Sequence, residues 1–451
     1  MLTQKTSQPF GRETPRVTNR DALAGVGRIS RAIAKDTFQT GIGTRKLGCD
    51  GIPVVTLQNG VACDAGTAGV PVNALRANGK TIALPGLLGI GSAGGAGAIM
   101  VTVDSGLAIV PPHIASLFAG LESDGSSFGL FYSTAGAAFV NGTYGGAVSV
   151  VGIAIHPTTP AVMYAACGAA GVLKSIDSGA TWTAVNTGLA GQVVNCITID
   201  PTNTVQILIG CGAGPAGLGG VLASSDGGAS WAVRSTGMSD PFGVPGYGVN
   251  VWCLAWSSDG ILFAGGNSGR VYISSDVGAS WGAGITGTGW PVRGLAVVQS
   301  GSLTLYAAVD GSGSNTGVYA SYSSGGSWTR IWASLDSLYL QAYSVAVDPT
   351  DPLVIYAGVG SGGYSTCGIY KTTNGGTSWT LVLDLTAVSS TCHINCLLID
   401  PASHLTIYAG ESGHGDGVYK STNGGSTWTQ INSGFPTGVF HEKRVSALAI
   451  G

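Results

Sequence analysis

"KSTNGGSTWTQINSG" (residues 420–434) is one of six near-copies of a single stretch in this chain. The copies recur about every fifty residues, and self-similarity at such a period indicates a repeat architecture. The other five are "KSIDSGATWTAVNTG" (174–188), "ASSDGGASWAVRSTG" (223–237), "ISSDVGASWGAGITG" (273–287), "ASYSSGGSWTRIW" (320–332) and "KTTNGGTSWTLVL" (371–383), and the shared tryptophans are Trp182, Trp231, Trp281, Trp328, Trp379 and Trp428.

Each copy lies within a larger pattern of four short strands. An alternating segment such as "VNCITIDP" (194–201) comes first, and a short apolar one such as "VIYAG" (354–358) follows. A third segment, for example "GVYKS" (417–421), enters the repeated stretch, and a fourth, for example "WTLVL" (379–383), leaves it. Four short strands in each period predict one blade of a β-propeller.

The repeated stretch itself reads Ser/Thr-x-Asp/Asn/Ser-x-Gly-x-Ser/Thr-Trp. A polar side chain at its third position can accept hydrogen bonds from nearby backbone N–H groups, so the turn needs no outside partner. Its glycine permits backbone angles that bulkier residues resist. The tryptophan supplies a large apolar surface, which we expect to lie between neighbouring blades. The stretch is therefore predicted to be structural.

This pattern resembles the Asp-box (BNR) repeat of sialidases, sortilin-type receptors, xyloglucanases and photosystem-assembly propellers. In that family the box lies at the outer edge of each blade, away from the ligand, so the resemblance implies the fold and says little about function. Ser323 departs from the pattern; the third position otherwise holds Asp177, Asp226, Asp276, Asn374 and Asn423.

Composition agrees with an all-β chain. The 451 residues include 75 glycines without a G-X-Y period, and 44% are hydrophobic against 10% charged, which excludes collagen and argues against disorder. Six copies cover about 148–434, and a worn seventh precedes them at 106–140, with Ala135 in place of the acid. The chain ends in "RVSALAIG" (444–451), a first strand with no blade to follow. We expect a seven-bladed propeller over 105–451, closed when this strand pairs in the first sheet.

The first hundred residues lack the repeat. Residues 1–46 carry nine Lys or Arg against three acids, a net charge of +6 that leaves −9 on the remainder. This basic arm, with a possible helix at 21–38, is expected to dock onto a partner, although a merely solvated segment is the alternative. Residues 47–104 predict a small glycine-rich β module. We see no apolar signal core at the start, and 81–103 is too rich in glycine for a membrane span.

The nine cysteines form no CxxC pair, which excludes zinc-ribbon and thioredoxin-like sites. Cys196, Cys253 and Cys396 occupy one repeat position, and small residues fill it elsewhere. We expect buried thiols that act as small hydrophobes there. Cys49 with Cys63, or Cys367 with Cys392, could pair in an oxidising setting. The small residues at the shared position are Gly152, Gly294, Ser344 and Ala447.

A ligand would be expected at the channel mouth, where the loops between second and third strands and between blades meet. Glycosidase chemistry would need two facing carboxylates there. The arginine pattern of sialidases and the arginine patch of the photosystem-assembly relatives are absent, and xyloglucanases use two propellers, so we expect no enzyme. The candidate ligand or partner face is Trp290, Trp332, Tyr247, Tyr364, Phe435, Glu411, His414, Asp416 and Asp310; further mouth residues are Glu122, Asp124, Asp240, Asp336, Glu442, His441 and Phe242.

Three other motifs fail on context. "GIGSAG" (89–94) is followed by a strand pattern, whereas a dinucleotide site must open a helix. "NGKT" (78–81) lacks the leading glycine of a P-loop, since Ala74 stands there. "ESGHGDG" (411–417) could bind a metal, but spacing alone is weak support. No cofactor, metal or nucleic acid is expected.

The sequence therefore predicts a non-catalytic structural or recognition protein. Its rigid propeller would be anchored through residues 1–46 to a larger assembly, such as the tail, fibre or capsid decoration of a phage virion or an extracellular surface. The alternative is a glycan-binding or glycan-hydrolysing propeller that acts at the channel mouth.

Overall fold

The computed structural model describes residues 116–122, 129–134, 138–212, 219–239, 249–285, 288–300, 302–311, 315–338, 340–360, 367–386, 392–412, 417–435 and 444–451, with four short strands between 61 and 101. The chain divides into two compact units, Met1–Ile114 and Ala115–Gly451. The predicted arm and its helix lie outside the described residues.

The described part of the first unit is an antiparallel sheet in the order β3-β2-β1-β4. Two of its strands fall in the segments "KTIAL" and "AIMVTV" of the predicted β module. The strands are β1 (Val61–Cys63), β2 (Ala74–Ala77), β3 (Lys80–Ala83) and β4 (Met100–Val101).

In the second unit the described strands form seven antiparallel four-stranded blades. Blades 6 and 7 are joined into one sheet by the single pair Gly360↔His393. Blade 1 comprises β32 (Val445–Ile450), β5 (Ser116–Leu121), β6 (Leu130–Thr134) and β7 (Val140–Asn141). Blade 2 comprises β8 (Gly152–Ile155), β9 (Met163–Ala166), β10 (Val172–Ser175) and β11 (Thr183–Ala184). Blade 3 comprises β12 (Val193–Ile199), β13 (Ile207–Gly212), β14 (Gly220–Ser224) and β15 (Ala232–Val233).

The remaining blades follow the same order, and two short 3-10 helices accompany them. Blade 4 comprises β16 (Val251–Trp256), β17 (Leu262–Gly266), η1 (Asn267–Gly269), β18 (Arg270–Ser274) and β19 (Gly282–Ile285). Blade 5 comprises β20 (Val292–Ser300), β21 (Ser302–Val309), β22 (Gly317–Ser321), β23 (Thr329–Arg330) and η2 (Ala333–Leu338). Blade 6 comprises β24 (Gln341–Val347), β25 (Ile355–Gly360), β26 (Gly368–Thr372) and β27 (Thr380–Asp384). Blade 7 comprises β28 (His393–Asp400), β29 (Ser403–Ser412), β30 (Val418–Ser421) and β31 (Thr429–Gln430).

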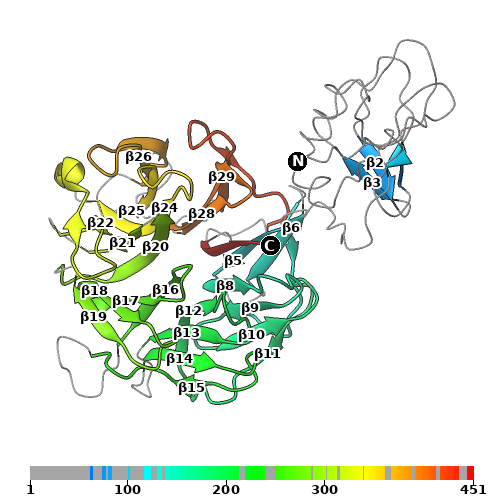
Figure 1. Cartoon of the computed structure of the whole chain (residues 1–451), viewed down its shortest axis with the longest axis horizontal. Coiled ribbons are helices and arrows are strands. Elements are labelled where there is room, and N and C mark those ends of the chain that lie inside the picture. Colours follow the sequence, from blue (N-terminus) through cyan, green and yellow to red (C-terminus); the bar gives the residue numbers. More distant parts are fainter. Residues whose placement is uncertain are drawn as a thin grey trace, which may run out of the picture. The chain divides into compact units, whose positions relative to one another are not determined.

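The blades close into a ring around their first strands. Each first strand contacts the next in the series β8, β12, β16, β20, β24, β28 and β32, and β32 contacts β8 again (Figure 1). The C-terminal strand β32 pairs with β5, from Val445↔Leu121 to Ile450↔Leu117. The predicted closure is confirmed: a strand from the end of the chain completes the first blade and leaves its sheet no free inner edge.

The hydrophobic core lies between blades. Each described cluster of buried side chains draws on two neighbouring blades, and the clusters cover all seven junctions. At the junction of blades 2 and 3, Tyr164 and Val172 pack with Ile207, Ile209 and Trp231. Because each blade is covered by its neighbours, the ring is stabilised as a whole.

The repeated stretch forms the turn between the third and fourth strands, and its third residue organises that turn. In blade 3, Asp226 accepts hydrogen bonds from the Ser230 backbone N–H (2.9 Å), the Ser230 hydroxyl (2.5 Å) and the Ser224 hydroxyl (2.6 Å). These bonds, above all those from the hydroxyls of Ser224 and Ser230, lower the pKa of Asp226 to about 2. The same backbone bond is made to Asp177, Asp276, Ser323, Asn374 and Asn423.

The tryptophans play two roles where one was predicted. Trp231, Trp281 and Trp379 donate from Nε1 to a backbone carbonyl of the preceding blade, at 2.7 Å in each case. All six indoles pack in the clusters between blades, as expected, and these three also form a hydrogen bond across the junction. The other three donate within their own turn, to the carbonyl of the turn glycine: Trp182 to Gly179, Trp328 to Gly325 and Trp428 to Gly425.

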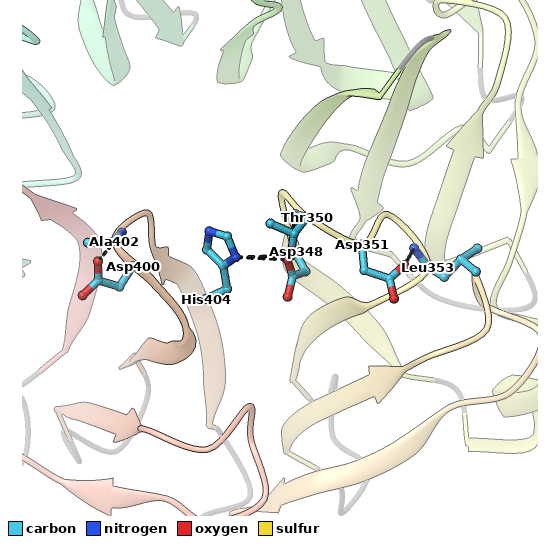
Figure 2. Close-up of polar contacts among 7 residues, drawn as sticks. All are labelled: Asp348, Thr350, Asp351, Leu353, Asp400, Ala402 and His404. Carbon is cyan, nitrogen blue, oxygen red and sulfur yellow. Dashed lines mark hydrogen bonds and ion pairs between the residues drawn. The ribbon is translucent and has the colours of Figure 1, made fainter. Parts of the chain in front are cut away.

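The turns between first and second strands lie on the same side of the ring as the repeated turns, and we call this side the turn face. After β24, Asp348 Oδ1 accepts hydrogen bonds from the backbone N–H (2.8 Å) and hydroxyl (2.6 Å) of Thr350. Burial would raise the pKa of Asp348, but these bonds outweigh it and lower the pKa. His404 Nδ1 lies 3.7 Å from Asp348 Oδ1, which links blades 6 and 7 (Figure 2).

Candidate functional site

Six of the seven first strands carry a β-bulge at the same place. In each, the pairing with the second strand shifts by one residue near the start of the first strand, on the side of the ring opposite the turn face. A bulge re-aims the extra side chain, and bulges are common beside active sites. The extra residues, which we call the bulge ring, are Asn195, Trp252, Arg293, Tyr343, Asn395 and Ser446.

The residue that follows each bulge is small because there is no room for more. A Cβ atom at Gly210 would lie 2.5 Å from Cys196 Sγ and 2.6 Å from Val251 Cγ1. Gly265 and Gly410 face the equivalent cysteines, Cys253 and Cys396, equally closely, and burial raises the pKa of both of these thiols to about 12. The expectation of buried thiols acting as small hydrophobes therefore agrees with the packing. The other residues that follow a bulge are Gly294, Ser344 and Ala447, and Gly152 holds the equivalent position in blade 2, whose described first strand pairs without a bulge.

The largest side chains of the bulge ring, Trp252, Arg293 and Tyr343, lie on blades 4 to 6. The Arg293 guanidinium lies 3.9 Å from the centre of the Trp252 ring, a cation–π contact, and its Nε donates to Asp310 Oδ2 at 3.0 Å. Arg293 keeps 32% of its side chain exposed, while Asp310 keeps 14%. The arginine is thus held in place with part of its surface open.

Tyr343 and His393 extend this cluster to blades 6 and 7. The Tyr343 hydroxyl donates to Gln341 Oε1 at 2.7 Å, and burial together with the Asp310 charge raises its pKa above the usual range. The His393 ring meets the Tyr343 ring edge-on, 4.6 Å between centres, and burial lowers its pKa. At Gly360 a Cβ atom would lie 2.4 Å from the His393 ring, so the imidazole is closely confined.

A disulfide joins Cys367 to Cys392, immediately before His393. Of the two pairings that the sequence allowed, this one forms, and Cys49 lies outside the described residues. The bridge connects the start of β26 to the residue before β28, so it fixes the strand end that carries His393. Among the cysteines whose side chains the structure describes, the others are free thiols: Cys167, Cys196, Cys211, Cys253 and Cys396.

A second ion pair lies where the ring closes. Arg444 NH1 lies 3.4 Å from Glu122 Oε2, and the Ser446 hydroxyl lies 3.4 Å from Glu122 Oε1. These residues connect β32 with the end of β5. The ion pair therefore joins the two ends of the propeller chain where the ring closes, and it also lies at the predicted channel mouth.

Of the five predicted ligand-face residues that the structure describes, three are buried. Trp290 remains partly open, 36% exposed, and packs over Gly311 beside Asp310. Trp332 is 1% exposed because it packs edge-on against Tyr370 and Trp379, which corrects its placement on a ligand face.

Two further predicted residues are buried. Phe435 stacks on Phe139 at 4.3 Å between ring centres, and Glu411 has no exposed surface. Neither can offer its side chain to a ligand without a rearrangement, so both placements are corrected. The structure gives no side-chain surroundings for Asp336, and Tyr247, Tyr364, His414, Asp416, Asp124, Asp240, Glu442, His441 and Phe242 lie outside the described residues.

Sequence patterns did not point to Trp252, Tyr343 or His393, because these residues lie in strands, whereas the ligand-binding residues of the propeller were predicted in its loops. A signal was nevertheless present. The bulged residue directly precedes the small position, and across the six bulged strands it varies widely in size and charge.

No protein-family model matches this chain, and no curated protein sequence is similar to it. Solved structures are similar. The GH74 xyloglucanase of Xanthomonas campestris superimposes with a TM-score of 0.50 at 20% identity, over 70% of this chain and 52% of that one. The GH74 enzyme of Niastella koreensis gives 0.50 at 19%, over 70% and 56%. YCF48 of Cyanidioschyzon merolae gives 0.46 at 16%, over 66% and 89%.

At these identities the two GH74 structures show the fold alone: this chain is a β-propeller protein. It spans about half the length of both GH74 chains. Within the described residues no helix is long and apolar enough to cross a membrane, and no three His, Cys, Asp or Glu side chains cluster as metal ligands would.

Proposed function

We propose that this chain is a non-catalytic recognition protein that binds a protein partner through its bulge ring. One observation carries the proposal. Across six first strands the bulge and the small residue after it recur, while the bulged side chain ranges from Ser446 and Asn195 to Arg293 and Trp252. Packing accounts for the bulge and for the small residue after it. Recognition accounts for variation at the one position that the bulge re-aims.

The residue types favour a protein partner. Tryptophan, tyrosine and arginine dominate the binding energy of protein interfaces, and the bulge ring carries one of each on adjacent blades. Arg293 is already oriented by Asp310 and Trp252, so little side-chain entropy would be lost on binding.

The test compares substitutions on the two faces. A partner recovered with the full chain should bind Arg293→Ala and Tyr343→Ala at least about 10-fold more weakly, as expected for interface residues worth more than about 1.4 kcal/mol. Leu405→Ala, which alters an exposed side chain of the turn face, should bind normally. Equal loss in all three variants, or loss only in Leu405→Ala, would contradict the proposal.

We further propose that residues 1–46 attach the propeller to a larger assembly, such as a phage tail, fibre or capsid decoration, or an extracellular surface. Its support is the charge contrast between a +6 arm and a −9 remainder. Mass spectrometry of purified particles should find the full chain, and a variant beginning at residue 47 should be absent from them. Particles that retain the shortened chain would refute this anchoring role.

A glycan ligand is the second candidate, and Trp290 favours it. Its partly exposed indole beside Asp310 combines a stacking surface with a hydrogen-bonding carboxylate. Hydrolysis is less favoured, because Asp310 is engaged by Arg293 and Glu411 is buried, whereas a glycosidase needs two accessible facing carboxylates. A glycan array and assays for sugar release from xyloglucan, each with a Trp290→Ala control, test this candidate; no binding and no release would eliminate it.

A further inference from the structure

A cavity of about 560 Å³ opens on the side of the ring away from the bulges. It is formed where the first strands of blades 3 to 6 end and their turns begin. Trp252 belongs to the bulge ring and Trp256 lines the cavity, so four residues of β16, roughly 13 Å, separate the two sites. The lining residues are Thr198, Ile199, Pro201, Trp256, Ser257, Ser258, Val297, Val298, Gln299, Val347 and Pro349.

The walls carry no formal charge, although three acids, Asp200, Asp259 and Asp348, lie in the same turns. Asp200 stands between Ile199 and Pro201 but is buried, and its Oδ1 accepts the Thr202 N–H (2.8 Å) and hydroxyl (2.7 Å). Asp348 is likewise engaged by its own turn and by His404 (Figure 2). Both Asp-Pro turns therefore present apolar atoms to the cavity and hold their carboxylates in the turns.

Hydrogen-bonding groups come from blades 4 and 5. The Ser258 hydroxyl donates to Gln299 Oε1 at 2.5 Å, and Gln299 Nε2 lies 3.5 Å from Asp259 Oδ2. This arrangement orients the amide of Gln299 so that a second N–H remains on Nε2. Trp256 Nε1 is buried and has no acceptor in the structure. The buried Trp332 Nε1 likewise has no acceptor, so this feature is not confined to the cavity.

We propose that this cavity binds one neutral sugar residue. Such a ring offers an apolar face to Trp256 and the prolines, and hydroxyl groups to Gln299, Ser258 and Thr198. An anionic ligand would be disfavoured by Asp200, Asp259 and Asp348 nearby, and a purely apolar one would leave the hydroxyl and amide groups without partners. The volume falls within the range usual for small-molecule sites.

The test uses the full chain with nitrogen-15 in its tryptophans. Methyl glucoside, methyl galactoside and N-acetylglucosamine are titrated in turn, with glucuronate as the charged counterpart and hexaproline as a peptide. The Trp256 indole signal, assigned as the one missing from Trp256→Phe, should shift with at least one neutral sugar. Gln299→Leu should weaken the binding of that sugar about 10-fold or more, equivalent to about 1.4 kcal/mol. Gln430→Leu, the same change on an exposed strand of blade 7, should not.

Several results would overturn the proposal. These are no shift with any neutral sugar up to about 50 mM, binding that survives Gln299→Leu, stronger binding of glucuronate, or a shift with hexaproline alone. Trp256→Phe could disturb the fold. Gln299 is exposed, so Gln299→Leu should leave the fold intact and still tests the site. Arg293→Ala changes the bulge ring and should leave sugar binding unaltered, so this site and the proposed partner site fail independently.

Discussion

In the repeated turn, two consecutive residues adopt left-handed backbone angles. Glycine holds the second position in all six turns, as at Gly228 (φ 90°) and Gly325 (φ 90°). The first position is glycine in three blades, but elsewhere it carries side chains: Ser178 (φ 60°), Val277 (φ 57°) and Ser324 (φ 54°). Left-handed angles disfavour any residue with a Cβ atom, so these three turns contain removable strain.

Ser324→Gly should therefore stabilise the protein by about 0.5–1 kcal/mol, because relief of the left-handed strain exceeds the extra entropy that glycine gives the unfolded chain. Ser324 is exposed, so no packing is lost. Urea unfolding measures the difference. The matched control, Gly228→Ser, should destabilise, since its Cβ atom would meet Tyr164 at 3.0 Å. A loss of stability in Ser324→Gly would show that the turn is not strained.

His393 should make stability depend on pH. Burial lowers its pKa in the folded protein below the ordinary value of 6.5, so the unfolded chain takes up the proton first. Stability is then unaffected above about pH 6.5 and falls as the pH drops below it.

Thermal unfolding at about pH 7.5 and about pH 5.5 tests this assignment. His393→Asn should reduce the fall in melting temperature between the two conditions. His156→Asn, which changes a partly exposed histidine of another blade, is the control. An unchanged fall in His393→Asn would exclude His393 as its source.

At the scale of strands, local features were predictable and the bulges were not. The turn around Asp226 is made by bonds within five residues, so the sequence alone indicates it. The bulge at Trp252 depends on how β16 pairs with β17, a register set by contacts between strands. For the same reason Trp332, which looked like an exposed loop aromatic, is buried by blade 6.

The disulfide between Cys367 and Cys392 should stabilise blade 6. It closes a loop of 25 residues, for which loss of unfolded-state entropy predicts about 3.5 kcal/mol. Replacing both cysteines with alanine should lower the free energy of unfolding by up to this amount and broaden the NMR signals of the adjacent His393. Alanine at Cys211, a buried free thiol, serves as the comparison. No change in stability after removal of the bridge would show that the pair is not bonded in the native protein.

At the scale of the molecule, the period of about fifty residues and the terminal segment after Arg444 were enough to predict a closed ring. The sequence could not show which side chains gather at each end of the channel, because that depends on where the seven first strands begin and end in space. The predicted site residues in glycine-rich loops therefore rested on loop position alone, whereas Arg293 and Tyr343 lie at bulges that depend on strand pairing.

Hydrogen–deuterium exchange of the C-terminal peptide, residues 444–451, tests the closed ring most directly. Its strand β32 pairs with β5. The Ser116 N–H donates to the Gly451 carbonyl at 2.9 Å, and the Gly451 N–H donates to the Ser116 carbonyl at 3.1 Å. If the ring is closed, the β32 amides should exchange as slowly as those of β5, because both open only when the whole propeller unfolds. Exchange of residues 444–451 within seconds, while β5 stays protected, would contradict the account.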